Sequence, residues 1–489
     1  MTRRSPRLLY YNDSRHYYLY CFDPPLSMEE AWTPVDEVAG TQVDVLVYGY
    51  GAGACMPFDT KVGEVWFQAL KEHLVYGWRG GENVRSLIDR GLDPLTVLID
   101  RAHERNMDFY SSIRLSMGAG QTLGWNVNTF GMSHPEYWIE PDMPTGSCGH
   151  LDFMHDAVRQ ERFALIEESM TRYDIDGFEL DFVFSPVYFE AGAITAGIPV
   201  MTEYVREIRK LALEAGKRRG RPIRLGARVH PGFPGNLIAG LDVVAWIEEG
   251  LLDFVVPICY INWLLDQALP FEQLAETAHD HDCAVYPAIR PFFLKHEQSS
   301  TPAMYRAAAS AFRRKGADAL YLLEMKWPLG DDERCTLSEI ADPNLVRGKS
   351  RHYFISPRNE DATKYFYTSP IPLSLQVVGD GPPQEADIYM GDDIQAESRE
   401  GRLEDVRLRL RISGISALDS IEVTLNGRML PIDQRQYTSV SYLYAWVEYP
   451  LLDSPPRPGI NTIGIAVRSR PTGLAEAMKL EEAEIRVEY

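Results

Sequence analysis

The residues with the clearest capacity for chemistry lie in one short run, Arg172-Tyr-Asp-Ile-Asp-Gly-Phe-Glu-Leu-Asp-Phe-Val-Phe-Ser-Pro. Side chains alternate between the two faces of a strand, so a strand here places Gly177, Glu179 and Asp181 on one face. Two neighbouring carboxylates repel each other when both are charged, which raises the pKa of one of them. Such a pair can divide the acid and base roles of a reaction.

A further carboxylate, Glu324, lies in Leu322-Leu-Glu-Met-Lys-Trp, where the two-residue spacing places it on one face with Lys326. We expect this segment to lie across a barrel from the first. Glycosidic cleavage usually needs one carboxyl group to protonate the leaving oxygen and a second to attack or stabilise the sugar cation. The predicted catalytic residues are therefore Asp181 as nucleophile or charge stabiliser, and Glu324 or Glu179 as general acid.

Other polar and aromatic side chains occur at equivalent depth, at or near the ends of predicted strands. Their aromatic faces can stack on sugar rings, although aromatic residues also fill cores. An alternative role for Glu179 and Asp181 is a structural ion pair with inward Arg or Lys side chains of neighbouring strands. The candidate substrate-binding residues are Asp13, Tyr50, Arg114, Arg228, His230, Tyr260, Asn262, Trp263, Arg290, Lys326 and Trp327.

Eight short segments rich in β-branched and aromatic residues would position these side chains, each separated from the next by room for a helix. Their alternation and number predict an α/β fold, a (β/α)8 TIM barrel, with an open doubly wound sheet as the alternative. Long loops at 51–63 and 116–150 would then build the substrate pocket. The segments are 8–12, 43–50, 107–115, 175–183, 223–230, 254–262, 284–290 and 319–327.

Several helices between these segments carry recognisable start signals. Ser27 and Glu30 fit the capping-box pattern. Asp93 followed by proline predicts a helix that runs to about Arg105. Residues 158–173 and 202–217 carry apolar residues at helical spacing, with charges on the other faces.

The pattern changes after about residue 345, which predicts a second domain. Residues 1–345 are expected to form the barrel, 346–370 a connector and 371–489 a small antiparallel β-sandwich. Period-two strands are predicted at 406–412, 421–425, 442–449, 461–467 and 482–488, joined by turns such as Asn426-Gly427.

Charge and cysteine content narrow the classes of function. Asp and Glu outnumber Lys and Arg by 70 to 49, and the formal charge of -21 repels nucleic acid and anionic membranes. The six scattered cysteines show no metal-binding spacing and indicate free thiols in a reducing compartment. With no signal-peptide core and no apolar run long enough to cross a membrane, the chain is predicted to be cytoplasmic. The sequence shows no metal-binding motif, so no metal or cofactor is expected. The predicted partner is an oligosaccharide or glycoside. Assembly into a homo-oligomer is left open.

Three runs resemble the glycosyl-hydrolase-like barrel proteins labelled family-10-like: Gly149-His-Leu-Asp-Phe-Met-His-Asp, Leu225-Gly-Ala-Arg-Val-His and Gly250-Leu-Leu-Asp-Phe-Val-Val-Pro. Together with the run that contains Asp181, the resemblance covers roughly residues 130–345. It implies a barrel and glycan hydrolysis. The segment after the barrel is similar to the accessory sandwiches of many glycosidases, which implies either packing or sugar binding.

The segment Asp176-Gly-Phe-Glu-Leu-Asp is also similar to two better understood patterns. The chitinase pattern aligns Asp176, Glu179 and Asp181 but puts Val183 where the catalytic acid should stand. The α-amylase-like pattern aligns Asp181 with the nucleophile and has Arg in place of Glu179. Neither set of catalytic roles therefore transfers intact.

These observations predict a glycoside hydrolase that uses inward carboxylates at the carboxyl ends of barrel strands. Two alternatives stay open. One is a non-catalytic glycan-binding protein on a degenerate barrel, which Val183 motivates. The other is a lyase or isomerase that holds an acidic sugar by Arg114, Arg228, Arg290 and Lys326.

Overall fold

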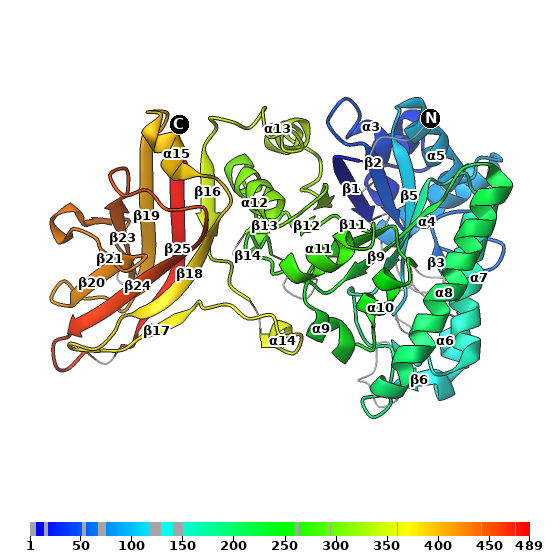
Figure 1. Ribbon diagram of the computed structural model, residues 1–489. Helices are drawn as coiled ribbons and strands as arrows, with labels where there is room; N and C mark the ends of the chain where they lie inside the picture. Colours follow the sequence, from blue (N-terminus) through cyan, green and yellow to red (C-terminus); the bar gives the residue numbers. More distant parts are fainter. Residues whose placement is uncertain are drawn as a thin grey trace. The chain divides into compact units, whose positions relative to one another are not determined.

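A computed structural model describes residues 6–13, 18–50, 55–66, 75–116, 129–139, 150–259, 264–293, 295–358, 360–441, 443–474 and 476–489. The chain forms two compact units (Figure 1). The first comprises Met1–Ile261, Pro270–Ala288 and Ala317–Ser338, and the second comprises Asn262–Leu269, Ile289–Gly316 and Glu339–Tyr489. The predicted boundaries at residues 345 and 371 stay predictions.

The first unit is organised by a curled, parallel sheet of nine strands. Its spatial order is β11-β10-β9-β8-β5-β2-β1-β15-β12. The strands are β1 (Leu8–Asp13), β2 (Val45–Gly49), β5 (Asp108–Arg114), β8 (Gly177–Asp181), β9 (Arg224–Val229), β10 (Phe254–Pro257), β11 (Ala284–Val285), β12 (Ala288–Ile289) and β15 (Leu320–Leu323).

The two ends of this sheet are pieces of the same chain segment. β11 and β12 are separated by only two residues, and both fall within the predicted seventh strand, 284–290. The Asp318 amide donates to the Val285 carbonyl at 3.0 Å, and the Tyr321 amide donates to the Pro287 carbonyl at 3.3 Å. The sheet therefore curls back on itself, and the predicted α/β barrel is confirmed.

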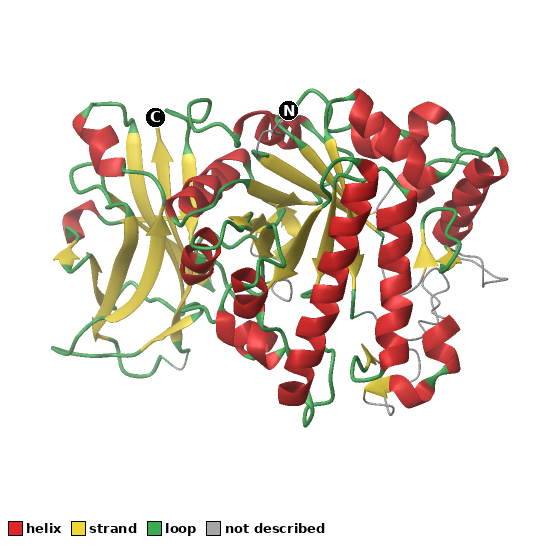
Figure 2. Cartoon of the chain, turned by 45° about the vertical axis from the view of Figure 1, so that its right-hand side comes forward, coloured by secondary structure: helices red, strands yellow, loops and turns green. Residues whose placement is uncertain are grey.

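Helices cover this sheet, as Figure 2 shows. The residues that cap two of them are those predicted from the sequence. Ser27 accepts from the Glu30 amide at 3.2 Å, and Glu30 accepts from the Ser27 amide at 2.8 Å, so the capping box is confirmed. Asp93 caps α5 (Pro94–Glu104). The two long predicted helices are α7 (Asp156–Arg172) and α8 (Ile194–Arg219). The other helices of this unit are α1 (Tyr18–Cys21), α2 (Met28–Ala31), α3 (Thr33–Asp36), α4 (Val75–Asp89), α6 (Thr129–Ser133), α9 (Phe233–Ile238), α10 (Val243–Glu248) and α11 (Glu272–His279); α13 (Asp331–Glu339) begins in it.

Aromatic rings occupy the space that glycines on the neighbouring strand leave in the interior of the sheet. A Cβ atom on Gly226 would lie 2.2 Å from the Phe254 ring, and one on Gly177 would lie 2.8 Å from the Tyr110 ring. Each missing side chain therefore makes room for a ring from the neighbouring strand. The interior is packed, as barrel interiors are, and it forms the floor beneath the strand ends.

The second unit contains two antiparallel sheets that enclose a shared apolar core. The six-stranded sheet is β16-β25-β19-β23-β22 with β17 beside β25, and the four-stranded sheet is β18-β24-β20-β21. These sheets confirm the predicted sandwich. The strands are β16 (Arg351–Phe354), β17 (Leu373–Leu375), β18 (Gln384–Met390), β19 (Asp405–Ser413), β20 (Ser420–Leu425), β21 (Arg428–Met429), β22 (Gln436–Thr438), β23 (Tyr444–Pro450), β24 (Gly459–Ser469) and β25 (Met478–Glu488).

This unit also takes in segments that precede the predicted sandwich. β16 lies in the predicted connector and pairs with β25. Gln267 donates to the carbonyls of Met304 and His352 and accepts from the Phe354 amide at 3.0 Å. α12 (Pro302–Arg314), α14 (Glu360–Thr363) and α15 (Ile394–Arg399) also belong to this unit.

Two further features of the described residues concern membrane-spanning helices and free cysteines. None of its helices is long and apolar enough to cross a membrane. The described cysteines Cys21, Cys55, Cys259, Cys283 and Cys335 are free thiols, and Cys148 lies outside the described residues.

Candidate active site

Glu179 and Asp181 lie at the carboxyl end of β8, and both are fully buried. Strand register decides their neighbours, because Ser112 of β5 stands beside Glu179, and Arg228 of β9 stands beside Asp181. Arg114 of β5 flanks Asp181 on its other side. Three adjacent parallel strands therefore bring two carboxylates and two guanidinium groups together.

Arg228 is the centre of this cluster. Its guanidinium donates to Glu179 Oε1 at 2.6 Å, to Asp181 Oδ2 at 3.1 Å and to the Tyr321 hydroxyl at 2.7 Å. The Tyr11 ring lies 4.2 Å from the guanidinium carbon, at cation–π distance. Burial works to lower the pKa of Arg228, but Glu179, Tyr321 and Asp181 together outweigh it and hold that pKa well above its usual value. Arg228 is thus a fixed cation.

The two oxygens of Glu179 have different environments. Oε1 accepts from the Ser112 hydroxyl at 2.7 Å, from Arg228 and from the Tyr321 hydroxyl at 3.2 Å. Oε2 is buried and accepts no hydrogen bond from any described residue. Burial raises the pKa of Glu179 and the charge of Asp181 adds to the rise, whereas Arg228, Ser112 and Tyr321 oppose it. Glu179 is therefore the member of the pair that is better suited to hold a proton.

Asp181 is held differently, because donors reach both of its oxygens. The backbone amides of Val183 and Phe184 donate to Oδ1 at 3.0 and 3.1 Å, and Arg228 donates to Oδ2. Arg114 Nε lies 3.9 Å from the same Oδ2. The two acids therefore differ in how their oxygens are held, since donors reach both oxygens of Asp181 but only Oε1 of Glu179 among the described residues.

Asp13 and Arg114 form a second buried ion pair beside this cluster, with 2.5 Å between Oδ2 and the guanidinium nitrogen. The Arg114 guanidinium carbon also lies 3.7 Å from the centre of the Phe184 ring. Both residues were predicted as substrate-binding, and each now has a buried protein partner.

Glu324, Lys326 and Trp327 all follow β15, which ends at Leu323. Two-residue alternation therefore does not govern their orientation. Glu324 is half-buried and Lys326 is exposed. The side chain of β15 that reaches Glu179 and Arg228 is Tyr321.

Trp327 leads to a carboxylate that sequence reasoning missed. Its indole nitrogen donates to Glu37 Oε2 at 3.0 Å, and Asn12 donates to Glu37 Oε1 at 3.2 Å. Burial raises the pKa of Glu37 to about 7, against the opposing effect of both hydrogen bonds. Glu37 follows the short helix α3, and no local pattern connects it with a residue 290 positions away.

The remaining candidates are placed less uniformly. Tyr50 is buried, and its hydroxyl lies 2.5 Å from the Ser111 hydroxyl, one residue from the Ser112 that contacts Glu179. His230 follows β9, and burial lowers its pKa to about 3, so it is neutral at pH 7. Arg290 is buried and belongs to the second unit. The candidates Tyr260, Asn262 and Trp263 lie outside the described residues.

Sequence reasoning also missed Ser112, Tyr11 and Tyr321, which complete the cluster around Arg228. Tyr11 could have been predicted from the sequence, because it lies in a predicted strand two residues before Asp13. As for metals, no group of three or more His, Cys, Asp and Glu side chains in the described ranges is placed to hold an ion.

Residues 59–210 match the family model Glycosyl hydrolase-like 10, which confirms the resemblance predicted from the sequence. The matched segment contains β5 and β8 and therefore Arg114, Glu179 and Asp181. No curated protein sequence matches the chain.

The chain is similar, at low sequence identity, to solved structures that include the following three. An α-L-fucosidase isoenzyme 2 from Paenibacillus thiaminolyticus is 12% identical, with a TM-score of 0.43, and the match covers 68% of this chain and 48% of that one. A cycloisomaltooligosaccharide glucanotransferase from Paenibacillus sp. is 10% identical, with a TM-score of 0.35 and coverages of 98% and 57%. The PgaB glycoside hydrolase domain from Bordetella bronchiseptica is 11% identical, with a TM-score of 0.40 and coverages of 70% and 96%. The chain thus spans about half the length of the first two proteins.

Proposed function

We propose that the protein is a glycoside hydrolase that cleaves a glycosidic bond in an oligosaccharide or glycoside, with Asp181 as nucleophile or charge stabiliser and Glu324 or Glu179 as general acid. The observation that carries the proposal is the unequal pair at the carboxyl end of β8. Asp181 has donors on both oxygens, whereas Oε2 of Glu179 is buried without a hydrogen-bond partner among the described residues, and burial raises the pKa of Glu179. Hydrolysis of a glycosidic bond needs such a division between a charged and a protonated carboxyl group. The match to a glycosyl hydrolase-like family over the same residues supports this assignment.

Asp181 is the proposed nucleophile or charge stabiliser. It is the last residue of β8, and active sites of such barrels lie at the carboxyl ends of the strands. Arg228 and the Val183 and Phe184 amides fix its carboxylate, so little reorganisation is needed when positive charge develops on the sugar.

The general acid is Glu324 or Glu179, and different observations support each. Glu179 has the raised pKa that an acid needs, but it lies one layer below Asp181 and is fully buried. Glu324 is half-buried in the segment that follows β15, the strand whose Tyr321 contacts Glu179 and Arg228. Glu179 can also serve by positioning Arg228.

The contacts weigh against a lyase or isomerase that holds an acidic sugar on Arg114 and Arg228. Arg228 already binds Glu179, Asp181 and Tyr321, and Arg114 binds Asp13. A substrate carboxylate would have to displace these partners. A glycan-binding protein without catalysis remains an outcome of the experiment below.

The test is a hydrolysis screen with aryl-glycosides and with plant, algal and microbial oligosaccharides, read out as released sugar. The wild type is compared with Asp181→Asn and with a matched control, Asp100→Asn, on an exposed position of α5. We expect release by the wild type and the control and none by Asp181→Asn. Turnover by a folded Asp181→Asn protein would overturn the assignment of Asp181. Saccharide binding without release by any of the three proteins would favour the binding protein.

A further inference from the structure

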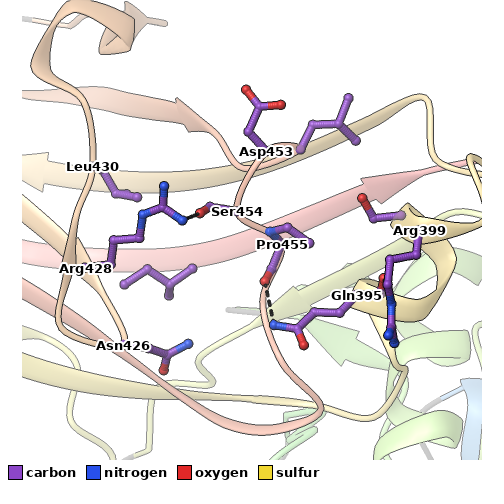
Figure 3. Close-up of a pocket in the computed structure, with 11 residues that line it drawn as sticks. Gln395, Arg399, Asn426, Arg428, Leu430, Asp453, Ser454 and Pro455 are labelled. Carbon is purple, nitrogen blue, oxygen red and sulfur yellow. Dashed lines mark hydrogen bonds between the residues drawn. The ribbon is translucent and has the colours of Figure 1, made fainter.

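A polar groove lies in the second unit. Its volume is about 710 Å³, within the range of pockets that hold small molecules. Three segments line it: α15, the hairpin between β20 and β21, and the loop after β23 (Figure 3). The lining residues are Gln395, Ser398, Arg399, Leu425, Asn426, Arg428, Leu430, Leu452, Asp453, Ser454 and Pro455.

The three segments are tied together across the groove. Arg428 donates to the Ser454 hydroxyl, and Gln395 donates to the Pro455 carbonyl at 3.3 Å, as Figure 3 shows. The side chains of Leu425 and Leu430, which also line the groove, are almost completely buried. The groove is therefore held in shape by these hydrogen bonds, and both apolar and hydrogen-bonding side chains line it.

Arg399 and Arg428 are the charged donors of this groove. Arg399 donates from Nε to the Gln395 carbonyl at 3.2 Å, and Arg428 contacts Ser454. In the described part of the chain, neither guanidinium forms an ion pair with a carboxylate. Several other arginines of the sandwich do form one: Arg407 with Asp405, Arg409 with Glu448, Arg411 with Glu482 and Arg468 with Glu422.

The chemistry of the lining selects an anionic ligand. Two guanidinium groups stand against the single carboxylate of Asp453, in a chain whose formal charge is -21. A guanidinium fork matches the paired oxygens of a carboxylate or a sulfate. No aromatic side chain is among the lining residues, so ring stacking cannot supply the affinity that a neutral sugar needs. The hydrogen-bonding groups of Gln395, Asn426 and Ser454 suit the hydroxyls of a saccharide.

We propose that this groove binds an oligosaccharide that carries carboxylate or sulfate groups, with its anionic groups held by Arg399 and Arg428. The saccharide part of the inference rests on the proposed glycoside hydrolase function, whereas the anionic part rests on the groove alone. The groove then retains acidic glycan chains on the second unit without taking part in bond cleavage.

The experiment measures binding by isothermal titration calorimetry with the full chain. The probes are an oligogalacturonate tetrasaccharide, a sulfated galactan tetrasaccharide and neutral maltotetraose. We compare the wild type with the Arg399→Ala/Arg428→Ala double variant. Lys479→Ala/Arg486→Ala removes the same number of exposed cations from β25 and serves as the matched control. All four substituted positions are exposed, so the variants are expected to fold.

We expect at least one acidic probe to bind the wild type and the control, and to bind the groove variant at least about tenfold more weakly. Raising the salt concentration should weaken the wild-type interaction, because exposed charges are screened. The probe that binds distinguishes a carboxylate from a sulfate. Equal affinity for maltotetraose, unchanged affinity in the groove variant, or no binding of either acidic probe would overturn the proposal.

Asp181→Asn separates this proposal from the proposed hydrolase activity. If the groove is the binding site, Asp181→Asn binds the acidic probe as the wild type does, whether or not the wild type hydrolyses anything. If Asp181→Asn loses binding while Arg399→Ala/Arg428→Ala keeps it, the anion binds at the barrel and the groove proposal fails.

Discussion

Replacement of Arg228 by methionine tests how the buried pair is held. The substitution keeps an unbranched apolar side chain but removes the donors to Glu179, Asp181 and Tyr321. Both carboxylates are at most 1% exposed, so water cannot replace the lost partner. Removing one partner of a buried ion pair typically costs about 3–5 kcal/mol, and we expect a loss of that size in the free energy of unfolding at pH 7.

The loss should shrink as the pH falls. Without Arg228, the folded-state pKa of Glu179 rises further above its unfolded value, so the folded state binds protons more readily than the unfolded state. Stability then falls as the pH rises between those two values. The variant should therefore be closer to the wild type in stability at pH 5 than at pH 7.

A double-mutant cycle with Glu179→Gln isolates the interaction. Glutamine removes the charge that Arg228 neutralises, while Asp181 keeps the Val183 and Phe184 amides. Arg228→Met should then cost only about half as much, with a coupling energy on the order of 1.5–2.5 kcal/mol. The assay is urea unfolding followed by tryptophan fluorescence at pH 5 and pH 7. A loss below about 1 kcal/mol, or a loss that does not change with pH, would refute the reasoning.

Three further predictions concern other parts of the barrel unit. The free energy of unfolding of Glu37→Gln should equal that of the wild type near pH 4.5 and exceed it by about 1–3 kcal/mol at pH 8. The reason is that the wild type loses stability as the pH rises from the pKa of Glu37 in the unfolded chain to its folded-state pKa of about 7. Urea unfolding at both pH values, followed by tryptophan fluorescence, checks this, and equal stabilities at pH 8 would contradict it. Gly226→Ala should cost about 1–3 kcal/mol, since the added methyl would lie 2.2 Å from the Phe254 ring; an unchanged urea midpoint would contradict the packing argument. If Glu324 is the general acid, Glu324→Gln should slow cleavage of alkyl glycosides while sparing dinitrophenyl glycosides, whose leaving group needs no proton; equal losses on both substrates would exclude that role.

The sequence was sufficient to predict the elements of the barrel and the faces of its strands. The alternation in 175–183 placed Glu179 and Asp181 on one face, and both meet Arg228 in the structure. Such patterns are local, because a strand needs only its own residues to set which side chains share a face. The capping signals of Ser27 and Asp93 were equally local.

The contacts between strands could not be predicted in the same way. The pairing of Asp181 with Arg228 depends on the register between β8 and β9, and a shift of one residue would turn the guanidinium away. The alternation predicted for 319–327 failed beyond Leu323 because the strand ends there, and Tyr321 is the residue that reaches the cluster. Glu37 was missed because its partners Asn12 and Trp327 are distant along the chain.

The composition of the second unit has a consequence for how the protein is made. Gln267 and α12 leave the ribosome well before β16 and β25, yet all of them belong to one compact unit. At translation rates of about 5–20 residues per second, the roughly 200 residues between Gln267 and β25 take on the order of 10 s or more to emerge. During that interval the early segments have no completed sheet to pack against. Nascent chains should therefore stay protease-sensitive in Asn262–Leu269 and Ile289–Gly316 until β25 has been synthesised.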